Sequence, residues 1–248
     1  MKYIASCSGG KDSIATIILA REHKEPLDVV IFSEVMFDES ISGELPEHID
    51  FIKNVAFPLF ENWGYETKIL REDRNYMDLF MRYPTKGKRV GLGLKSGFPM
   101  AGKCVINKDL KIRPIKKYLK SLNKDYVQYI GIAADEPKRL ERLKDPDKIS
   151  LLAKYGYTEK DAYKLCKQYG LLSPIYSFTR RGGCWFCPNC RDPELKHLRE
   201  QHPELWNKLL ALENEPNLIG KMWNTLTRTS IHSKEAQFQA EGKQLSLF

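Results

Sequence analysis

The segment Ser8-Gly9-Gly10-Lys11-Asp12-Ser13 is the first in the chain whose residue types and order could do chemistry. An apolar run precedes it and an apolar periodic stretch follows it, a pattern that predicts a strand, a glycine turn and a helix. Such a turn presents free backbone N–H groups at the positive end of the helix dipole, where anions bind. The two glycines let the backbone approach phosphate oxygens closely, while the lysine and the serines add a positive charge and hydroxyl donors.

Asp12 decides which phosphate ligand this loop suits. A carboxylate repels a bare phosphate, but it fits a nucleotide whose polyphosphate carries Mg²⁺. The Walker pattern Gly-x-x-x-x-Gly-Lys-Ser/Thr is absent, so the loop is not the usual cradle of NTP-hydrolysing proteins. The sequence predicts a Mg-nucleotide site here, and the alternative is a Gly-Gly turn that binds nothing.

Cysteines supply the second group of chemical interest. Cys184, Cys187 and Cys190 form a Cys-x-x-Cys-x-x-Cys pattern, whose two-residue spacers let the thiolates converge on one zinc ion or iron–sulfur cluster. Either centre needs a fourth ligand. Cys7 and Cys166 are predicted to be small buried apolar residues. His197 and His202 lack a tight spacing and are predicted to lie on a solvated helix surface.

The totals describe an ordinary globular chain with a basic net charge. It has 248 residues, 42% of them apolar and 29% charged, and no apolar run reaches the roughly 20 residues of a membrane helix. The N-terminus enters a predicted strand at once, so no signal peptide is expected. Six cysteines without such a signal indicate a reducing, cytoplasmic location. A net charge of +8 is compatible with a nucleotide or nucleic-acid partner, or with a generally basic surface.

The elements that must position these residues alternate in an α/β rhythm. Strands are predicted at residues 2–6, 29–33, 66–70 and 126–132, and helices at 13–22, 46–63 and 114–122. This order favours a mainly parallel sheet with helices on both faces. Residues 71–103 are rich in Gly and Lys and are predicted to form a long loop. The expected domains are therefore a nucleotide-binding domain over 1–150, a helical cysteine-rich region over 151–230 and a flexible tail over 231–248.

Residues 8–13 resemble the PP-loop of N-type ATP pyrophosphatases, in the branch that holds phosphoadenosine-phosphosulfate (PAPS) reductases and tRNA or DNA thiolation enzymes. Three further segments are similar to that branch: "CVINKDLKIRPIKKYL", "YIGIAADEPKRLERL" and "PIYSFTRRGGCWFCPNC". The last resembles the cysteine-rich end of bacterial and phage PAPS-reductase-like proteins. The resemblance covers roughly residues 1 to 210. It implies an adenine-nucleotide α-hydrolase-like fold with a doubly wound sheet, followed by a helical cysteine-rich region.

The resemblance also assigns roles to residues. It implies that ATP is cleaved between its α and β phosphates to adenylate a substrate, with Lys11 and Asp12 as catalytic residues. ATP and Mg²⁺ would be held by Ser8, Gly9, Gly10, Lys11, Asp12 and Ser13, with Arg139 at a phosphate. Cys104 matches a cysteine of the branch and becomes the fourth ligand beside Cys184, Cys187 and Cys190. The centre is predicted to be a [4Fe–4S] cluster, with structural zinc, as in deazaguanine-forming PP-loop synthases, as the alternative.

The sequence departs from PAPS reductases in two respects. Their Glu-Cys-Gly-x-His tail, which carries the sulfur nucleophile, is absent, so reduction of PAPS is not expected. The Asp-Thr-Gly that often follows the second strand is replaced by "FSEVMFDES", in which Glu34 or Asp38 could substitute.

The last five residues, Gln244-Leu245-Ser246-Leu247-Phe248, resemble the bacterial sliding-clamp-binding pentapeptide at every position. The polar residues before them fit a tether, so clamp binding is predicted; the alternative is an apolar plug folded onto its own domain.

The sequence as a whole predicts a PAPS-reductase-like PP-loop enzyme that uses ATP for sulfur transfer or a related modification, with an adenine nucleotide, DNA or tRNA as partner. Three alternatives remain: an assimilatory sulfonucleotide reductase, a zinc-containing ATP-dependent synthase or ligase, and a non-enzymatic clamp- and DNA-binding module.

Overall fold

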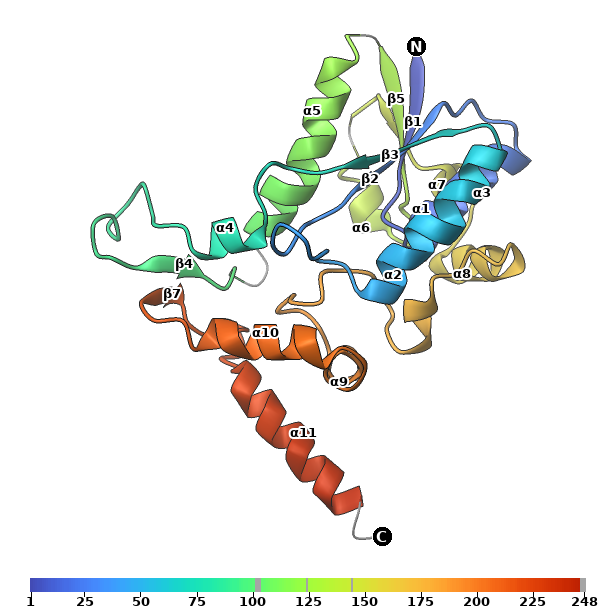
Figure 1. Cartoon of the computed structure of the whole chain (residues 1–248). Coiled ribbons are helices and arrows are strands. Elements are labelled where there is room, and N and C mark those ends of the chain that lie inside the picture. The colour runs from blue at the N-terminus through green and yellow to red at the C-terminus, as the bar shows by residue number, and fades with distance from the viewer. Residues whose placement is uncertain (101–103, 124, 144, 246–248) are drawn as a thin grey trace. The chain divides into compact units, whose positions relative to one another are not determined.

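The computed structural model of the chain describes residues 1–245 apart from 101–103, 124 and 144, and side chains as far as residue 242 (Figure 1). Contacts divide the chain into two compact units, each built from three stretches of sequence. Unit 1 contains Met1–Glu34, Glu44–Glu72 and Lys111–Gly182, and unit 2 contains Val35–Gly43, Asp73–Leu110 and Gly183–Phe248.

Five parallel strands form the sheet of unit 1, in the order β3-β2-β1-β5-β6. Their bounds are β1 Lys2–Ser6, β2 Val29–Ser33, β3 Glu66–Leu70, β5 Tyr126–Ile130 and β6 Lys148–Ile149. The first four were predicted from the sequence, and the α/β fold with a doubly wound, mainly parallel sheet is confirmed. The last strand was missed because two residues are too few to show a strand pattern.

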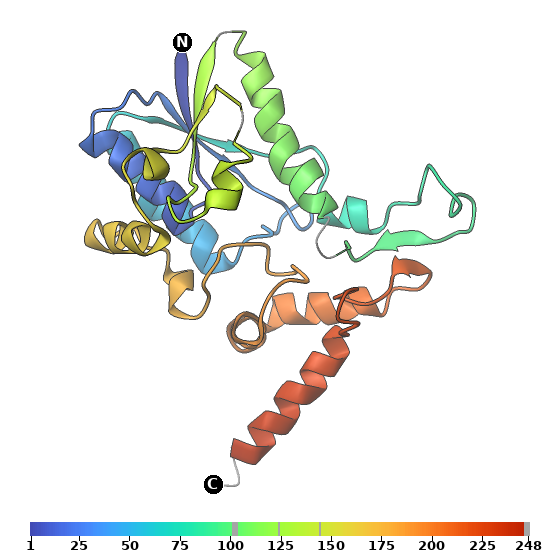
Figure 2. The same cartoon turned by 180° about the vertical axis from the view of Figure 1, so that it is seen from behind.

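Side chains of the central strands alternate between two apolar faces, as the two-residue period of a strand requires. Ala5, Val30 and Phe32 point to one face, and Ile4, Val29 and Ile31 point to the other. The first face is covered by helices α1 Lys11–Glu22, α2 Pro46–Asp50, η1 Phe51–Ala56, α3 Phe57–Asn62, α7 Leu151–Lys154 and α8 Glu159–Gln168. The second face is covered by α5 Arg113–Ser121. Figures 1 and 2 show α5 on one side of the sheet and α1 to α3 on the other. Two short helices, α6 Pro137–Leu140 and η3 Pro174–Ser177, complete unit 1.

The strand order fixes where this sheet can receive a ligand. The chain passes from β1 to β2 and β3 on one side, then returns to β5 on the other side of β1. In open α/β sheets, ligands bind at the carboxyl ends of the strands where the order reverses. Here that point lies between the loops that follow β1 and β5. The two loops approach closely, because a Cβ on Gly131 would come within 2.7 Å of the backbone of Asp12 and Ser13.

Unit 2 consists of short elements around an aromatic core. They are α4 Tyr76–Phe80, the parallel strand pair β4 Lys95–Gly97 and β7 Leu218–Gly220, and helices α9 Asp192–Gln201, α10 Pro203–Glu213 and α11 Ile231–Leu245. The π-helical segment η2 Asn107–Ile112 links the two units along the chain. The aromatic core contains Phe37, Tyr76, Phe80, Phe98, Trp185 and Phe186.

The observed units differ from the domains expected with boundaries at residues 150 and 230. Helices α7 and α8 belong to unit 1, because Leu151, Leu152 and Leu165 enter the same apolar cluster as α1. Residues 71–103, expected as a loop, contain α4 and β4. Helix α4 forms because Asn75 caps its first turn, in a capping box with Asp78. Helix α8 likewise begins with a capping box, formed by Thr158 and Asp161.

The expected flexible tail is helical from residue 231 to residue 245. Helix α11 is ordered by its apolar side, where Ile231 and Phe238 are buried and the Phe238 ring lies 6.1 Å from that of Trp206. Glu235 adds an ion pair with Arg199 at 2.8 Å. Within the part of the chain that the structure describes, no helix is both long and apolar enough to cross a membrane.

Candidate functional site

The loop between β1 and α1 is shaped by Gly9, which has a φ of +71°. Glycine adopts this left-handed conformation without strain. A side chain would also collide with neighbours, because a Cβ at Gly9 would lie 2.6 Å from Ile52 and 2.8 Å from His48. The following residue, Gly10, is the N-cap of α1 and has no side chain to cap it. The loop therefore leaves its N–H groups to partners from elsewhere.

Serine hydroxyls hold the loop in shape. Ser13 Oγ accepts a hydrogen bond from the Ser8 N–H at 3.0 Å and donates one to the Gly10 carbonyl at 2.9 Å. Ser8 Oγ accepts from the Gly10 N–H at 3.4 Å. Both serines predicted as ligand donors are thus also structural parts of the loop.

Lys11 and Asp12 lie together at the start of α1. The Lys11 ammonium is 2.8 Å from a carboxylate oxygen of Asp12 and 3.0 Å from one of Glu159. Burial lowers the pKa of Lys11, but hydrogen bonds to these two carboxylates raise it more, so its pKa lies above the ordinary value. Lys11 is charged, and its ammonium is shared between two acids.

The carboxylates around Lys11 form a group with excess negative charge. Burial raises the pKa of Asp12 despite its bonds with Lys11, and the nearby charges of Glu159 and Glu136 raise it further. A divalent cation would relieve this repulsion, because hard cations prefer carboxylate oxygens. The donor set fits the Mg²⁺ that the PP-loop resemblance implies.

Two residues that the sequence did not single out contact the loop directly. Tyr176 Oη accepts a hydrogen bond of 2.9 Å from the Lys11 N–H. His48 Nε2 lies 3.0 Å from the Ser8 carbonyl, and its Nδ1 lies 2.8 Å from Ser173 Oγ. Because a carbonyl only accepts, Nε2 carries the proton and Nδ1 accepts from Ser173. Burial lowers the pKa of His48, which fits this neutral form.

A sequence signal existed for only one of these residues. Tyr176 falls within the segment "PIYSFTRRGGCWFCPNC", which resembles a family segment. Only the cysteines of this segment were predicted to be functional. His48 stands in the first turns of a helix and has no motif around it.

Arg139, predicted at a phosphate, pairs with a carboxylate instead. Its guanidinium lies 2.6 Å from Glu136, and the arginine side chain is about half exposed. Glu136 in turn accepts from the Ala133 N–H in the loop after β5. Arg139 thus contacts the acidic group through Glu136, whose charge acts on Asp12.

Cys7 and Cys166 are buried apolar residues, as predicted. Burial raises the pKa of the Cys7 thiol to about 11 and that of Cys166 to about 12. Such thiols are poor nucleophiles at neutral pH. Both thiols contact the backbone of the loop, since Cys7 Sγ accepts from the Gly9 N–H at 3.4 Å and Cys166 Sγ donates to the Lys11 carbonyl at 3.1 Å.

The Cys184–Cys190 segment of unit 2 folds as two successive turns. The Cys187 N–H donates to the Cys184 carbonyl at 3.0 Å, and the Cys190 N–H donates to the Cys187 carbonyl at 3.0 Å. Trp185 anchors the segment, because its backbone N–H donates to Gly43 and its indole N–H to Ser42, each at 2.9 Å.

Tyr76 brings Cys104 into the same neighbourhood. Its ring stacks 4.0 Å from Phe186, which stands between Cys184 and Cys187. Burial raises the pKa of Tyr76 well above its ordinary value, and the nearby thiols of Cys184, Cys104 and Cys187 raise it further. Cys104, Cys184 and Cys187 therefore all lie near Tyr76, although 80 residues of sequence separate Cys104 from Cys184.

The surroundings of these thiols fit a thiolate-bound centre. Among the described residues none of the four cysteines forms a disulfide, and the Tyr76 hydroxyl is completely buried with no hydrogen-bond partner. A buried hydroxyl without a partner is costly unless an acceptor completes it. A thiolate or sulfide of a bound zinc or iron–sulfur centre would supply that acceptor. Soft sulfur ligands suit both metals.

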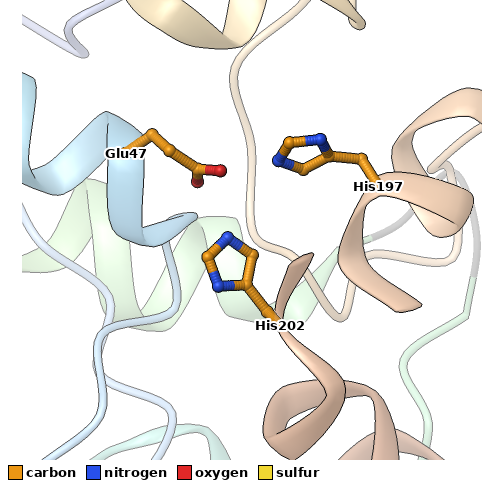
Figure 3. A group of neighbouring side chains, drawn as sticks. All are labelled: Glu47, His197 and His202. Carbon is orange, nitrogen blue, oxygen red and sulfur yellow. The ribbon is translucent and has the colours of Figure 1, made fainter. Parts of the chain in front are cut away.

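His197 and His202 were predicted to lie on a solvated helix surface, but they are not fully solvated. Both are half-buried, and their rings meet edge-on with centroids 5.8 Å apart (Figure 3). The cause is the turn at His202, which ends α9 and precedes α10. Figure 3 also draws Glu47, a residue of unit 1.

The clamp-like pentapeptide is only partly within the described chain. Gln244 and Leu245 end helix α11, whereas Ser246, Leu247 and Phe248 lie outside the described residues.

Comparisons with known proteins give distant similarities. No protein-family model matches the chain. It is 26% identical over 219 residues to the uncharacterized protein MJ0973 of Methanocaldococcus jannaschii, an alignment that covers 82% of this chain and 45% of that protein. The chain therefore spans less than half the length of the curated relative it matches.

Two solved structures are similar over much of the chain. One is the PAPS reductase of Candida auris in a phosphate complex, with 10% identity, a TM-score of 0.47, and coverage of 75% of this chain and 82% of that one. The other is the U34-tRNA thiolase NcsA of Methanococcus maripaludis with its [4Fe-4S] cluster, with 18% identity, a TM-score of 0.46, and coverage of 86% and 71%.

Proposed function

We propose that the chain is a PP-loop ATP pyrophosphatase of the PAPS-reductase-like kind, which adenylates an acceptor and then exchanges the adenylate for sulfur. One observation carries this proposal: the Lys11 N–H, in the first turn of α1, holds an oxygen acceptor at 2.9 Å at the point where the strand order reverses. A phosphate oxygen of ATP would take the place of that acceptor, where the helix dipole also favours negative charge.

Each loop residue has a role in this proposal. Gly9 and Gly10 let the backbone approach the pyrophosphate portion of ATP, and the Lys11 ammonium turns from Glu159 to a phosphate oxygen. Asp12 binds Mg²⁺ together with the phosphates, with Glu136 and Glu159 close enough to contribute to the negative field. Arg139, released from Glu136, would neutralise a second phosphate oxygen.

The reaction balances without a redox step. An oxygen of the acceptor attacks the α-phosphorus, the bond from that phosphorus to the bridging oxygen of the β-phosphate breaks, and pyrophosphate leaves with Mg²⁺. Hydrosulfide then attacks the acceptor carbon, a carbon–sulfur bond replaces the carbon–oxygen bond, and AMP leaves. The positive groups of the loop stabilise the charge that develops on the leaving pyrophosphate.

Cys104, Cys184, Cys187 and Cys190 would hold the centre that handles sulfur, with a [4Fe–4S] cluster as the first proposal and zinc as the second. Bound there, an iron–sulfur cluster supplies sulfur-transfer or redox chemistry, whereas zinc supplies a structural support. The chain's own contribution is to converge the thiolates and to shield them with Tyr76, Trp185 and Phe186, all of which are almost completely buried.

Pyrophosphate release from ATP tests the proposal. Lys11→Ala and Asp12→Asn should each lower the release rate by about 100-fold or more, the usual cost of a lost transition-state contact. Lys160→Ala, on the exposed side of α8, is the matched control and should keep the wild-type rate. Unchanged release in both loop variants would show that the loop is a scaffold only.

We also propose that Gln244, Leu245, Ser246, Leu247 and Phe248 bind a bacterial sliding clamp, which would bring the enzyme to DNA. The proposal is supported by the sequence match and by the position of the motif at the end of α11. Binding of the full chain to a purified clamp should disappear when residues 244–248 are deleted, while pyrophosphate release is retained. Clamp binding that survives the deletion would contradict it.

A further inference from the structure

Unit 2 carries a loop, residues 82–94, whose charge is unusually one-sided. No Asp or Glu occurs from residue 79 to residue 108, whereas seven Lys and Arg residues do. We name residues 82–94 the basic loop. Its base is closed by two hydrogen bonds, because the Ser96 N–H and Oγ both donate to the Arg82 carbonyl, at 2.8 and 2.9 Å. A loop closed in this way keeps its position although its tip is open.

The cations of the basic loop face solvent. Arg82, Lys86, Lys88 and Arg89 are all exposed, and none forms an ion pair with a described residue. Lys95, just beyond the loop, differs because it pairs with Glu215 at 3.0 Å. The four loop cations carry their charge uncompensated, which costs self-repulsion unless a polyanion neutralises it.

Apolar side chains interrupt these cations and are also exposed. Tyr83 is 56% exposed, Val90 49% and Leu92 61%. No described atom lies within 4 Å of a Cβ built at Gly87, Gly91 or Gly93, so the backbone at the tip is in open space. A purely solvated charged loop gains nothing from exposed aromatic and aliphatic groups. Their presence indicates a ligand with both charges and flat apolar surfaces.

A second loop with similar residues follows β7, at the other end of the β4–β7 pair. Strand β4 follows the basic loop, and β7 leads into residues 221–229, where Lys221 and Arg228 are exposed. Met222 and Leu226 are 43% and 70% exposed. The strands are held tightly together, since a Cβ on Gly97 would lie 2.5 Å from the Gly220 carbonyl oxygen. Because the pair is parallel, residues 221–229 lie at the end of the pair opposite to the basic loop, and the basic loop alone is the candidate surface.

This surface is packed onto the aromatic core beside the cysteines. Phe98, which follows β4, meets Phe80 edge-on with ring centroids 5.2 Å apart. Phe80 lies 5.8 Å from Tyr76, the residue surrounded by the thiols of Cys104, Cys184 and Cys187. A ligand on the basic loop would thus be held by the same unit that holds the cysteines.

We propose that the basic loop binds a single-stranded stretch of nucleic acid. Arg82, Lys86, Lys88 and Arg89 contact phosphates, and Tyr83 stacks on an unpaired base, as aromatic residues do in single-strand-binding proteins. A duplex fits less well, because its bases are already stacked and offer no face to Tyr83. Binding of the strand does not depend on the proposed function. Only the chemistry done on the bound strand rests on it, and there the inference names nucleic acid as the class of acceptor.

Fluorescence anisotropy with labelled 20-nucleotide single strands of RNA and of DNA, and with a duplex of the same length, tests the proposal. The variant Lys86→Ala/Lys88→Ala/Arg89→Ala should weaken binding and reduce the slope of log K against log salt by about 2, since each lost phosphate contact removes about 0.7. The matched control Lys160→Ala/Lys164→Ala/Lys167→Ala removes the same charge from exposed positions of α8 and should keep the wild-type slope.

Tyr83 variants test stacking separately from charge. Tyr83→Ala should weaken binding by about 5- to 150-fold, the usual cost of a lost base–aromatic stack, without changing the salt slope. Tyr83→Phe, which keeps the ring, should bind like the wild type.

Four results would overturn the proposal: a wild-type slope in the loop variant, an equal loss of slope in the control, tighter binding of the duplex, or binding of neither single strand. Preference between the RNA and the DNA strand identifies the source. Binding of Mg-ATP should be normal in the loop variant, because the substitutions leave the PP-loop of unit 1 unchanged. A chain that binds single strands but releases no pyrophosphate would refute the proposed enzyme activity alone.

Discussion

The Lys11 backbone N–H donates a hydrogen bond of 2.9 Å to the phenolic oxygen of Tyr176, although the two residues are 165 positions apart in the sequence. This N–H belongs to the first turn of α1 and has no partner within the helix. A Cβ on Gly10 would also lie 3.3 Å from the same phenolic oxygen. The tyrosine oxygen thus occupies, in the nucleotide-free chain, a place that the proposed function gives to a phosphate oxygen.

Tyr176→Phe should therefore increase the affinity for Mg-ATP. The phosphate no longer competes with the phenolic oxygen, so the gain should equal one net hydrogen bond, about 2- to 12-fold in Kd. The same change should lower the free energy of unfolding of the nucleotide-free chain by about 1 kcal/mol, because the Lys11 N–H loses its acceptor. Calorimetric titration and urea unfolding measure the two effects.

Tyr163→Phe is the matched control for Tyr176→Phe. The Tyr163 ring packs edge-on against Tyr176 at 6.2 Å, but it is partly exposed and its hydroxyl makes no described contact with the loop. It should leave nucleotide affinity unchanged. Weaker binding in Tyr176→Phe would mean that the hydroxyl contacts the nucleotide rather than standing in for it.

His48 should make stability depend on pH. Burial lowers its pKa below the ordinary value of 6.5, so the unfolded chain takes up a proton that the folded chain refuses. The stability due to the neutral ring is complete above pH 6.5 and is lost as the pH falls toward the folded-state pKa. The loss should reach at most about 1.4 kcal/mol per pH unit.

The variant His48→Gln isolates this dependence. Its amide can still donate to the Ser8 carbonyl but does not titrate. At pH 7.5 it should be less stable than the wild type, and the difference in the free energy of unfolding should shrink between pH 6.5 and pH 5. Urea unfolding at several pH values measures it, and a difference that stays constant with pH would contradict the assigned tautomer.

Local patterns predicted the central fold well, because strand and helix signals in unit 1 agree with one another. The run Val29–Ser33 is buried along its whole length, and the Gly9-Gly10 turn leads directly into α1. The helix predicted from residue 46 to residue 63 is one continuous helical stretch with a π-helical middle, η1. A local deviation of hydrogen bonding leaves no mark on the spacing of apolar residues.

Long-range contacts explain what the sequence did not predict. Tyr176 reaches Lys11, and His48 reaches Ser8, through pairings that no periodicity encodes. Unit 2 is built from residues 35–43, 73–110 and 183–248. Patterns along the sequence assign these three stretches to different domains, so they did not predict this unit. Arg139 illustrates the opposite limit, since its expected role came from family position while its observed partner, Glu136, is three residues away.

Cys104 and Cys187 should be required for the bound centre, whereas Cys166 should not. In protein purified without oxygen, Cys104→Ser and Cys187→Ser should each remove most of the bound metal, because losing one thiolate opens the coordination shell. Cys166→Ser, a matched change at a buried thiol of unit 1, should keep the metal content of the wild type. Iron, acid-labile sulfide and zinc are measured in all three variants.

The metal content also decides between the two centres. About four irons and four sulfides per chain would support the cluster, whereas one zinc would make the cysteines a structural support. Full metal retention in Cys104→Ser would remove that residue from the site and leave a three-cysteine centre.

Tyr76 should affect the empty and the loaded protein in opposite directions. Its buried hydroxyl has no described partner, so Tyr76→Phe should stabilise the metal-free chain, by up to about 1 to 3 kcal/mol. In a loaded protein the hydroxyl would donate to a sulfur ligand held there, which would favour the more negative, reduced state. Tyr76→Phe should therefore keep its iron but have a more negative reduction potential, as followed by a redox titration with EPR detection.

Tyr83→Phe is the control, because Tyr83 is an exposed tyrosine of the same unit. It should change neither the stability of the metal-free chain nor the potential. An unchanged potential together with a destabilised metal-free chain would show that the Tyr76 hydroxyl donates to another acceptor and not to a sulfur of the centre.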